Sequence, residues 1–260
     1  MLNQADADSR SSMRKILVLG GTLQASALAQ ALAARGDAAV LSYAGRVAQP
    51  RQQPVAVRSG GFGGVAGLVD YLREHRVTHL VDATHPFAAR MSAHAVEACA
   101  RTGTALLALT REPWEPGVGD RWQIVPDMAA AVASLADPPR RILLALGRMH
   151  LEDFAARPRH HYILRLVDPP QEPPPLPRCS IVVSRGPFDV DGDVALLREH
   201  GVQLIVCKNS GGSGARAKLD AARLLGLSVI MVARPALPAR PQTTEVGQVL
   251  DWLDGAKPVA

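Results

Sequence analysis

Short runs of apolar residues recur along the chain, and longer segments rich in Ala and Leu separate them. The short runs are typical of strands buried on both faces of a parallel sheet, and the longer segments are typical of the helices that cover it. Strands are expected at 15–19, 38–42, 55–58, 78–83, 105–110, 122–125, 141–145, 161–165, 179–184, 203–207 and 227–232. Helices are expected at 23–34, 65–74, 86–102, 128–136, 150–156, 190–200, 215–225 and 245–253. This alternation predicts an α/β fold with parallel sheets.

The order of these elements predicts two domains. The segment 111–117 is rich in Pro and Gly, as expected for a hinge between domains. We therefore expect an N-terminal α/β domain over 14–113 and a C-terminal α/β domain over 120–240. The last segment, 241–260, holds a helix that could pack back on the first domain. Residues 1–13 are polar, without the apolar core of a signal peptide, and are expected to form a disordered leader.

The turn after the first strand is the first candidate ligand site. Gly20, Gly21 and Thr22 join the strand at 15–19 to the helix at 23–34. Glycines let the backbone approach a pyrophosphate, and the helix N-terminus offers free N–H groups. The spacing departs from the usual G-x-G-x-x-G pattern, so a tight turn without a ligand remains the alternative.

The end of the second strand indicates which dinucleotide such a turn would hold. Ser42 and Arg46 lie there, and the strand end carries no carboxylate. An acidic residue at this place suits NAD, whereas hydroxyl and guanidinium groups suit the additional phosphate of NADP. We therefore predict an NADP-binding first domain, although Arg46 could also be an ordinary loop residue.

Polar and glycine residues gather at further strand ends. Ligands of open α/β sheets bind beyond the carboxyl ends of the strands. The glycine-rich loop at 59–64 could lie flat against a ligand or simply connect two elements. The further candidates for cofactor binding are Gly61, Thr84, His85, Lys208, Asn209 and Ser210.

Arginines at other strand ends indicate an anionic substrate. The formal charge is +5 and the calculated pI is about 9.5. The basic residues are scattered and form no tail, which favours an anionic small ligand over nucleic acid. Guanidinium groups bind carboxylates in pairs of hydrogen bonds. Arg148, Arg165, Arg185 and Lys208 are the candidates for binding a substrate with many carboxylates, although each taken singly could be a surface residue.

Several classes of protein are disfavoured. Cys99, Cys179 and Cys207 show no metal-ligand spacing, and three unpaired cysteines suit a reducing cytoplasm. No apolar run approaches the ~20 residues that span a bilayer. We find no nucleophile elbow and no Walker loop. A dinucleotide fold without a nucleophile or a metal site of its own most simply performs hydride transfer.

The motifs together resemble a known family. They are Gly20-Gly21-Thr22, Ser42-Tyr43-Ala44-Gly45-Arg46, Gly60-Gly61-Phe62-Gly63, Asp82-Ala83-Thr84-His85-Pro86-Phe87-Ala88, Gly147-Arg148, Arg185-Gly186-Pro187-Phe188, Lys208-Asn209-Ser210-Gly211-Gly212 and Arg234-Pro235. Running from Lys15 to Pro235, they resemble the precorrin-6A reductase family. The resemblance implies a cytoplasmic, NADPH-dependent oxidoreductase of cobalamin biosynthesis. It would reduce the double bond between ring carbons 18 and 19 of precorrin-6A, giving precorrin-6B.

We expect two Rossmann-like domains, with cofactor and substrate in the cleft between them, in a monomer that binds neither nucleic acid nor membrane. The proton donor is unknown, and the candidates are His85, Asp189 and Lys208. The sequence leaves open whether the tetrapyrrole substrate is metal-free or contains cobalt. Alternatives are a non-redox tetrapyrrole-binding synthase and an NADPH-binding regulator. A short-chain-type dehydrogenase is disfavoured, because no Tyr is followed by a Lys four residues on.

Overall fold

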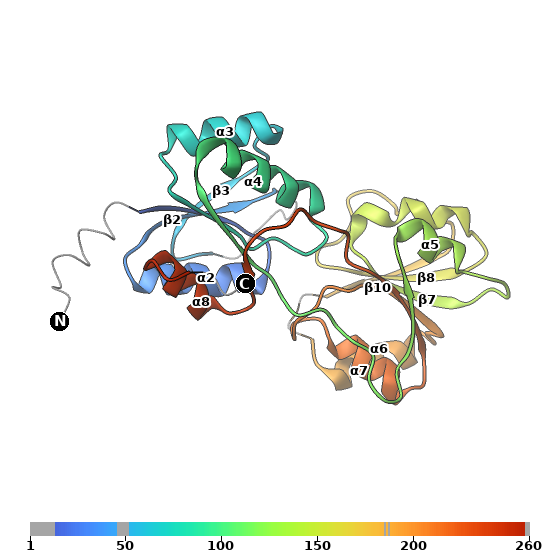
Figure 1. The fold of residues 1–260 in the computed structure, drawn as a ribbon. Helices are drawn as coiled ribbons and strands as arrows, with labels where there is room; N and C mark the ends of the chain where they lie inside the picture. The colour runs from blue at the N-terminus through green and yellow to red at the C-terminus, as the bar shows by residue number, and fades with distance from the viewer. Residues whose placement is uncertain (1–13, 46–51, 185, 187, 258–260) are drawn as a thin grey trace. The chain divides into compact units, whose positions relative to one another are not determined.

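The computed structural model describes residues 14–45, 52–184, 186 and 188–257, and its contacts divide them into two compact units (Figure 1). Unit 1 comprises the chain up to Arg111 together with the segment from Ala236 onward. Unit 2 comprises Glu112–Pro235. The predicted leader, residues 1–13, lies outside the described residues. Within the described part of the chain, no helix has both the length and the apolarity to cross a bilayer.

Unit 1 is built on a six-stranded sheet in which every pair of neighbouring strands is parallel. The strand order is β12-β5-β4-β1-β2-β3. The strands are β1 (Lys15–Leu19), β2 (Ala38–Tyr43), β3 (Ala56–Ser59), β4 (His79–Asp82), β5 (Ala105–Leu109) and β12 (Gln242–Thr243). The central strand β1 is almost wholly buried beyond Lys15, because helices cover both faces of the sheet.

Two helices cover each face of this sheet (Figure 1). They are α2 (Leu23–Ala34), α3 (Gly64–Glu74), α4 (Ala89–Thr102) and α8 (Val246–Leu253). Alternate residues of β1 face opposite layers: Ile16 and Val18 pack with α2 and α8, whereas Leu17 and Leu19 pack with α3 and α4. The last helix, α8, thus completes the apolar core on the α2 face.

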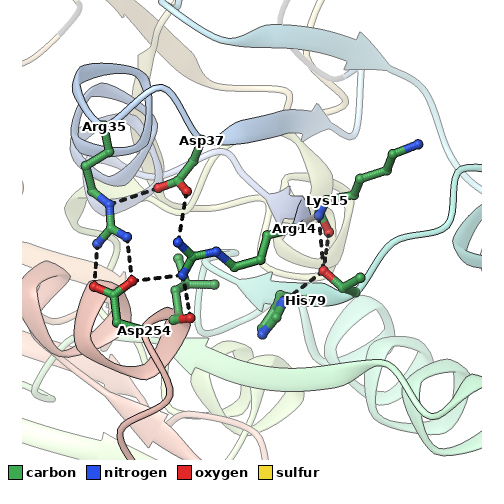
Figure 2. A network of polar contacts seen from close by, with 8 residues as sticks. Arg14, Lys15, Arg35, Asp37, His79 and Asp254 are labelled. Atoms are coloured by element: carbon green, nitrogen blue, oxygen red, sulfur yellow. Dashed lines mark hydrogen bonds and ion pairs between the residues drawn. The ribbon is translucent and has the colours of Figure 1, made fainter. Parts of the chain in front are cut away.

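A network of charged side chains joins the end of α8 to the rest of unit 1 (Figure 2). Arg14 lies between two carboxylates, with Nη1 2.8 Å from Asp254 Oδ1 and Nη2 3.7 Å from Asp37 Oδ1. Arg35, which follows α2, contacts the same two carboxylates at 3.0 Å (Asp37) and 2.7 Å (Asp254). The hydrogen bond from Arg35 lowers the pKa of Asp254, with a further contribution from Arg14 and against the effect of partial burial. The network joins the start of β1 and the ends of α2 and α8.

Unit 2 repeats the architecture with a second parallel sheet, ordered β6-β11-β10-β7-β8-β9. Its strands are β6 (Arg121–Val125), β7 (Arg141–Ala145), β8 (His161–Leu166), β9 (Cys179–Val183), β10 (Leu204–Lys208) and β11 (Ser228–Val232). Its helices are α5 (Met128–Ala133), α6 (Val190–Glu199) and α7 (Ala217–Leu224), with 3₁₀ turns η1 (Arg148–His150) and η2 (Glu152–Ala156). The helices α6 and α7 cover one face and α5 the other (Figure 1). The expectation of two Rossmann-like α/β units with parallel sheets is confirmed.

Three local expectations were wrong. The helix expected from Pro86 begins at Ala89, because the Ala88 N–H donates to the His85 carbonyl (2.7 Å) and closes a turn before the helix. The segment 150–156 forms part of two 3₁₀ turns instead of one helix. The two-residue strand β12 was missed; it pairs with β5 beside Leu109.

Candidate functional site

The strand order of unit 1 places a topological switch point between β1 and β4. The chain builds β2 and β3 on one side of β1, and β4 and β5 on the other. Such points are where ligands of open α/β sheets bind. Leu19 is in register with Asp82, so the two strands end together. Thr22 joins the two ends, because its hydroxyl donates to the Ala83 carbonyl (2.8 Å).

The turn from β1 to α2 leaves a set of backbone donors free. Gly20 N–H donates to the Ser42 carbonyl (2.8 Å), and Thr22 Oγ1 accepts from the Ala25 N–H (3.1 Å) as the N-cap of α2. In the described part of the chain, no acceptor is found for the N–H groups of residues 21–24. Gly21 has φ +118°, and nothing lies within 4 Å of where a Cβ would be. This turn can therefore bind an anion, because four donors meet the positive end of a helix dipole.

Beside the end of β2 lies an arginine of β3, Arg58, that sequence reasoning missed. Ser42 is 5% exposed, and its hydroxyl accepts a hydrogen bond from Arg58 Nη1 (2.7 Å). Arg58 also donates to the carbonyls of Gly60 (3.1 Å) and Gly61 (3.2 Å). Its guanidinium carbon lies 3.9 Å from the centre of the Phe62 ring. Arg58 is in register with Ser42 across β2 and β3, so pairing the predicted strands would have found it. The predicted Arg46 lies outside the described residues.

Asp82 organises the end of β4. The residue is 2% exposed, and its Oδ1 accepts from Thr84, at 3.2 Å from the backbone N–H and 2.7 Å from the hydroxyl. Its Oδ2 accepts from the Ser92 hydroxyl (2.6 Å) and lies 3.3 Å from Arg240 Nη2. The predicted Thr84 thus uses its hydroxyl as a donor to Asp82 in the turn after β4.

His85 follows in the same turn and is half-buried. Its Nδ1 accepts the N–H of Phe87 at 3.2 Å. From this hydrogen bond we assign the proton of the neutral ring to Nε2. Since His85 lies at the carboxyl end of β4, beside the β1–α2 turn, its Nε2–H could donate a hydrogen bond to a ligand bound there.

The loop Lys208–Gly212 follows the end of β10 in unit 2. The Asn209 side chain accepts from the Trp114 N–H (2.8 Å) and donates to the Trp114 carbonyl (2.9 Å). Trp114 Nε1 in turn donates to the Gly212 carbonyl (2.7 Å). The Ser210 carbonyl accepts from Arg234 Nη2 (3.3 Å). Asn209 is therefore a clamp on the segment that enters unit 2, whereas Lys208, half-buried at the strand end, lies at the switch point beside β7.

The predicted substrate-binding arginines differ in what they contact. Arg148 is exposed, and its Nη2 donates to the carbonyls of Asp168 (2.6 Å) and Pro169 (2.9 Å). Arg165 is buried in an ion pair with Asp193. The predicted Arg185 lies outside the described residues.

The predicted proton donor Asp189 is the N-cap of α6, and its Oδ1 accepts from the Gly192 N–H (2.8 Å). A capping carboxylate of this kind stabilises the start of its helix.

Unit 2 also holds a buried lysine that the sequence did not reveal. Lys218, in α7, is 6% exposed; its ammonium donates to the Ala215 carbonyl and lies 4.7 Å from the centre of the Trp114 ring. Burial lowers the pKa of Lys218. Burial also raises the pKa of the neighbouring Cys207 thiol to about 11 and that of Cys99 to about 12. Both thiols are therefore uncharged at neutral pH and unsuited to nucleophilic catalysis.

The predicted residues fall into two sets, one in each unit. Unit 1 holds Gly20, Gly21, Thr22, Ser42, Gly61, Thr84 and His85, and unit 2 holds Arg148, Arg165, Asp189, Lys208, Asn209 and Ser210. Among the described residues, no three His, Cys, Asp or Glu side chains gather as metal ligands would.

Comparison with known proteins identifies relatives over most of the length of the chain. The Precorrin-6A reductase of Rhodobacter capsulatus is 58% identical over 248 residues, covering 95% of this chain and 99% of the relative. The Precorrin-6A reductase of Mycobacterium tuberculosis strain H37Rv is 44% identical, covering 94% and 98%. The Cobalt-precorrin-6A reductase of Priestia megaterium is 31% identical, covering 85% and 91%.

A solved structure agrees with these relatives. The protein described as "CobK precorrin-6A reductase" superposes with a TM-score of 0.90 at 57% sequence identity, covering 94% of this chain and 98% of that one. A family model described as "Precorrin-6x reductase CbiJ/CobK" matches residues 15–254, which include the strands and helices of both units. The chain therefore belongs to the precorrin-6x reductase family.

Proposed function

We propose that this protein binds NADPH and reduces precorrin-6A to precorrin-6B in cobalamin biosynthesis, at the double bond between ring carbons 18 and 19. The observation that carries the proposal is the 58% identity, over 95% of the chain, to a relative named Precorrin-6A reductase. Relatives of that name at 44–58% identity support the metal-free substrate, since the Priestia megaterium relative named for the cobalt form is only 31% identical.

The β1–α2 turn fits the pyrophosphate of NADPH. Four N–H groups at residues 21–24 have no acceptor within the described chain, and Gly21 leaves open space in front of them. Donors at a helix N-terminus suit a phosphate group. Gly20 and Thr22 hold the turn against β2 and β4, through the Ser42 and Ala83 carbonyls. NADPH, when bound, supplies the hydride, and the protein supplies position and field.

The reduction also needs a proton at the neighbouring ring carbon. His85 is the candidate in unit 1, and only its imidazolium form can transfer a proton. To form it, Nδ1 must give up the hydrogen bond that it accepts from the Phe87 N–H. Lys208 is the candidate in unit 2, at the end of β10. Asp189 suits the role less well, because its carboxylate caps α6. We therefore propose His85 or Lys208 as the proton donor.

The carboxylates of the substrate need cationic partners. Arg148 and Lys208 follow or end the neighbouring strands β7 and β10 in unit 2, and we propose that both contact the acetate and propionate groups. Arg165 has a different role, because its charge is compensated by Asp193. All three cysteines are unpaired, which supports the inference of a reducing, cytoplasmic location. We further propose a monomer that binds neither nucleic acid nor membrane.

The proposal is tested by NADPH binding and turnover with matched variants at the two ends of α2. Gly21 and Gly36 both have positive φ, and a Cβ at either would meet nothing within 4 Å. We expect Gly21→Glu to abolish NADPH binding, because its carboxylate repels phosphate, and Gly36→Glu to retain it. The wild type should oxidise NADPH with precorrin-6A. Binding without turnover of either substrate form would indicate a regulator, and no binding would indicate a synthase.

A further inference from the structure

Arg58 is held rigidly at the carboxyl ends of β2 and β3. Its Nη1 donates to Ser42 Oγ (2.7 Å) and to the Gly60 carbonyl (3.1 Å). Its Nη2 donates to the Gly61 carbonyl (3.2 Å). The guanidinium also lies over the Phe62 ring, 3.9 Å from the ring centre, which restricts its tilt. Three acceptors and a ring therefore orient this group before any ligand arrives.

Counting donors shows that one edge of the guanidinium is unused. A guanidinium has five N–H donors. The two on Nη1 and one of the two on Nη2 are taken, so Nε–H and one Nη2–H remain. Neither has an acceptor in the part of the chain that the structure describes. These two nitrogens are neighbours, and such an edge binds an oxyanion with two parallel hydrogen bonds.

The charge of Arg58 is likewise without a carboxylate partner among the described residues. Most other half-buried or buried arginines of unit 1 differ: Arg14 and Arg35 share Asp37 and Asp254, and Arg240 contacts Asp82. A fixed cation without a counter-ion at a strand end favours binding of an anion there.

We propose that the free edge of Arg58 binds the 2′-phosphate of NADPH and so selects this cofactor over NADH. The inference rests on the proposed function, since it assigns a residue to the cofactor of that reaction. The end of the second strand is where dinucleotide folds meet the adenosine ribose. Ser42, which the sequence led us to expect at the phosphate together with Arg46, is 5% exposed and orients Arg58. Because the guanidinium is already ordered, binding costs little side-chain entropy.

The test is isothermal titration calorimetry with two matched pairs of ligands. NADP⁺ and NAD⁺ differ only in the 2′-phosphate, as do adenosine 2′,5′-bisphosphate and AMP. The wild type should bind the phosphorylated member of each pair at least about 100-fold more tightly, the ratio expected for two charge-assisted hydrogen bonds. Arg58→Met should bring both ratios close to one and leave the affinity for NAD⁺ unchanged.

Three further variants keep the test decisive. Arg73→Met removes an exposed arginine from α3 of the same unit and should retain the wild-type ratio. Arg58→Lys keeps the charge without the planar guanidinium, so its NADP⁺-to-NAD⁺ affinity ratio should be intermediate. This variant replaces Arg58→Met in the test if Arg58→Met does not fold. Ser42→Ala releases Nη1 and should lower the ratio with NAD⁺ affinity unchanged.

The two proposals fail in distinguishable ways. A wild-type ratio retained by both Arg58 variants would overturn the assignment of Arg58 while leaving an NADPH-dependent reductase intact. A wild-type protein that binds neither NADP⁺ nor NAD⁺ would overturn the proposed function together with this assignment.

Discussion

Replacing Asp82 by Asn should destabilise unit 1 strongly. Asn has nearly the same size and can still accept from Thr84, so the main change is the loss of charge. Arg240 then loses the carboxylate that lies 3.3 Å from its Nη2. Its side chain is only 8% exposed, and neither Nε nor Nη1 has a hydrogen-bond acceptor in the described chain. Removing one partner of a buried pair costs about 3–5 kcal/mol, and we expect a loss in this range.

The buried ion pair also predicts the effect of replacing its second member, Arg240. Arg240→Met should cost less than Asp82→Asn, because Asp82 keeps its hydrogen bonds from Thr84 and Ser92. The double variant should lose clearly less stability than the sum of the two single losses, because neither charge is left alone. The control is Glu97→Gln, which breaks an exposed ion pair with Arg101 in the same unit and should cost at most about 1 kcal/mol.

The assay must report on unit 1 alone. Trp252 lies in α8, whereas the other two tryptophans, Trp114 and Trp122, lie in unit 2. Urea unfolding followed by Trp252 fluorescence in a W114F/W122F background isolates the signal. A loss below about 1 kcal/mol for Asp82→Asn, or losses that add in the double variant, would show that the buried pair does not stabilise the end of β4 as argued.

Three further outcomes follow from unit 2 and from the charged network. Gly211→Ala should cost more than the matched Gly226→Ala in urea unfolding: both have positive φ, but only at Gly211 would a Cβ fall 2.2 Å from the Glu112 carbonyl oxygen. Asp254→Asn removes the carboxylate that contacts Arg14 and Arg35 (Figure 2), so it should speed amide exchange in α8. The stability lost at neutral pH should be only about 1 kcal/mol, because this carboxylate is half-exposed. Burial lowers the pKa of Lys218, so the unfolded state binds more protons than the folded state as the pH rises above the folded-state pKa. The free energy of unfolding should therefore rise with pH up to the ordinary lysine pKa of about 10.4. Lys218→Met should abolish this rise, as measured by urea unfolding at a series of pH values.

Most of the fold follows from the sequence because its signals are local. The strand at 15–19 and the helix at 23–34 match the expected limits, since an apolar run, a Thr cap and an Arg-Gly stop all lie within the segment itself. The start of α4 was misplaced, because a hydrogen-bonded turn at residues 85–88 delays the helix beyond Pro86. The strand β12 is two residues long and is defined only by its pairing with β5, so periodicity could not reveal it.

The contacts of the candidate site are harder to predict from the sequence, because the partners of its residues lie far away along the chain. The Asn209 amide suggested a ligand contact, yet its partner is Trp114, 95 residues distant. Arg165 was expected to bind a carboxylate of the substrate, and in the structure it pairs with the carboxylate of Asp193. Arg58 could have been found, since parallel pairing of β2 and β3 brings it beside Ser42. The sequence shows which groups are present, and the contacts show which of them the protein itself already uses.

Isotope labelling of the cofactor shows whether its hydride reaches the macrocycle. Precorrin-6A is incubated with the protein and NADPH that carries deuterium at the transferable position of its nicotinamide ring, and the product is analysed by mass spectrometry. We expect one deuterium on the macrocycle from the cofactor, and a second only when the solvent is D₂O. A precorrin-6A sample that remains unreduced while the wild-type protein binds NADPH, or a reduced product that carries no deuterium from the cofactor, would contradict the account.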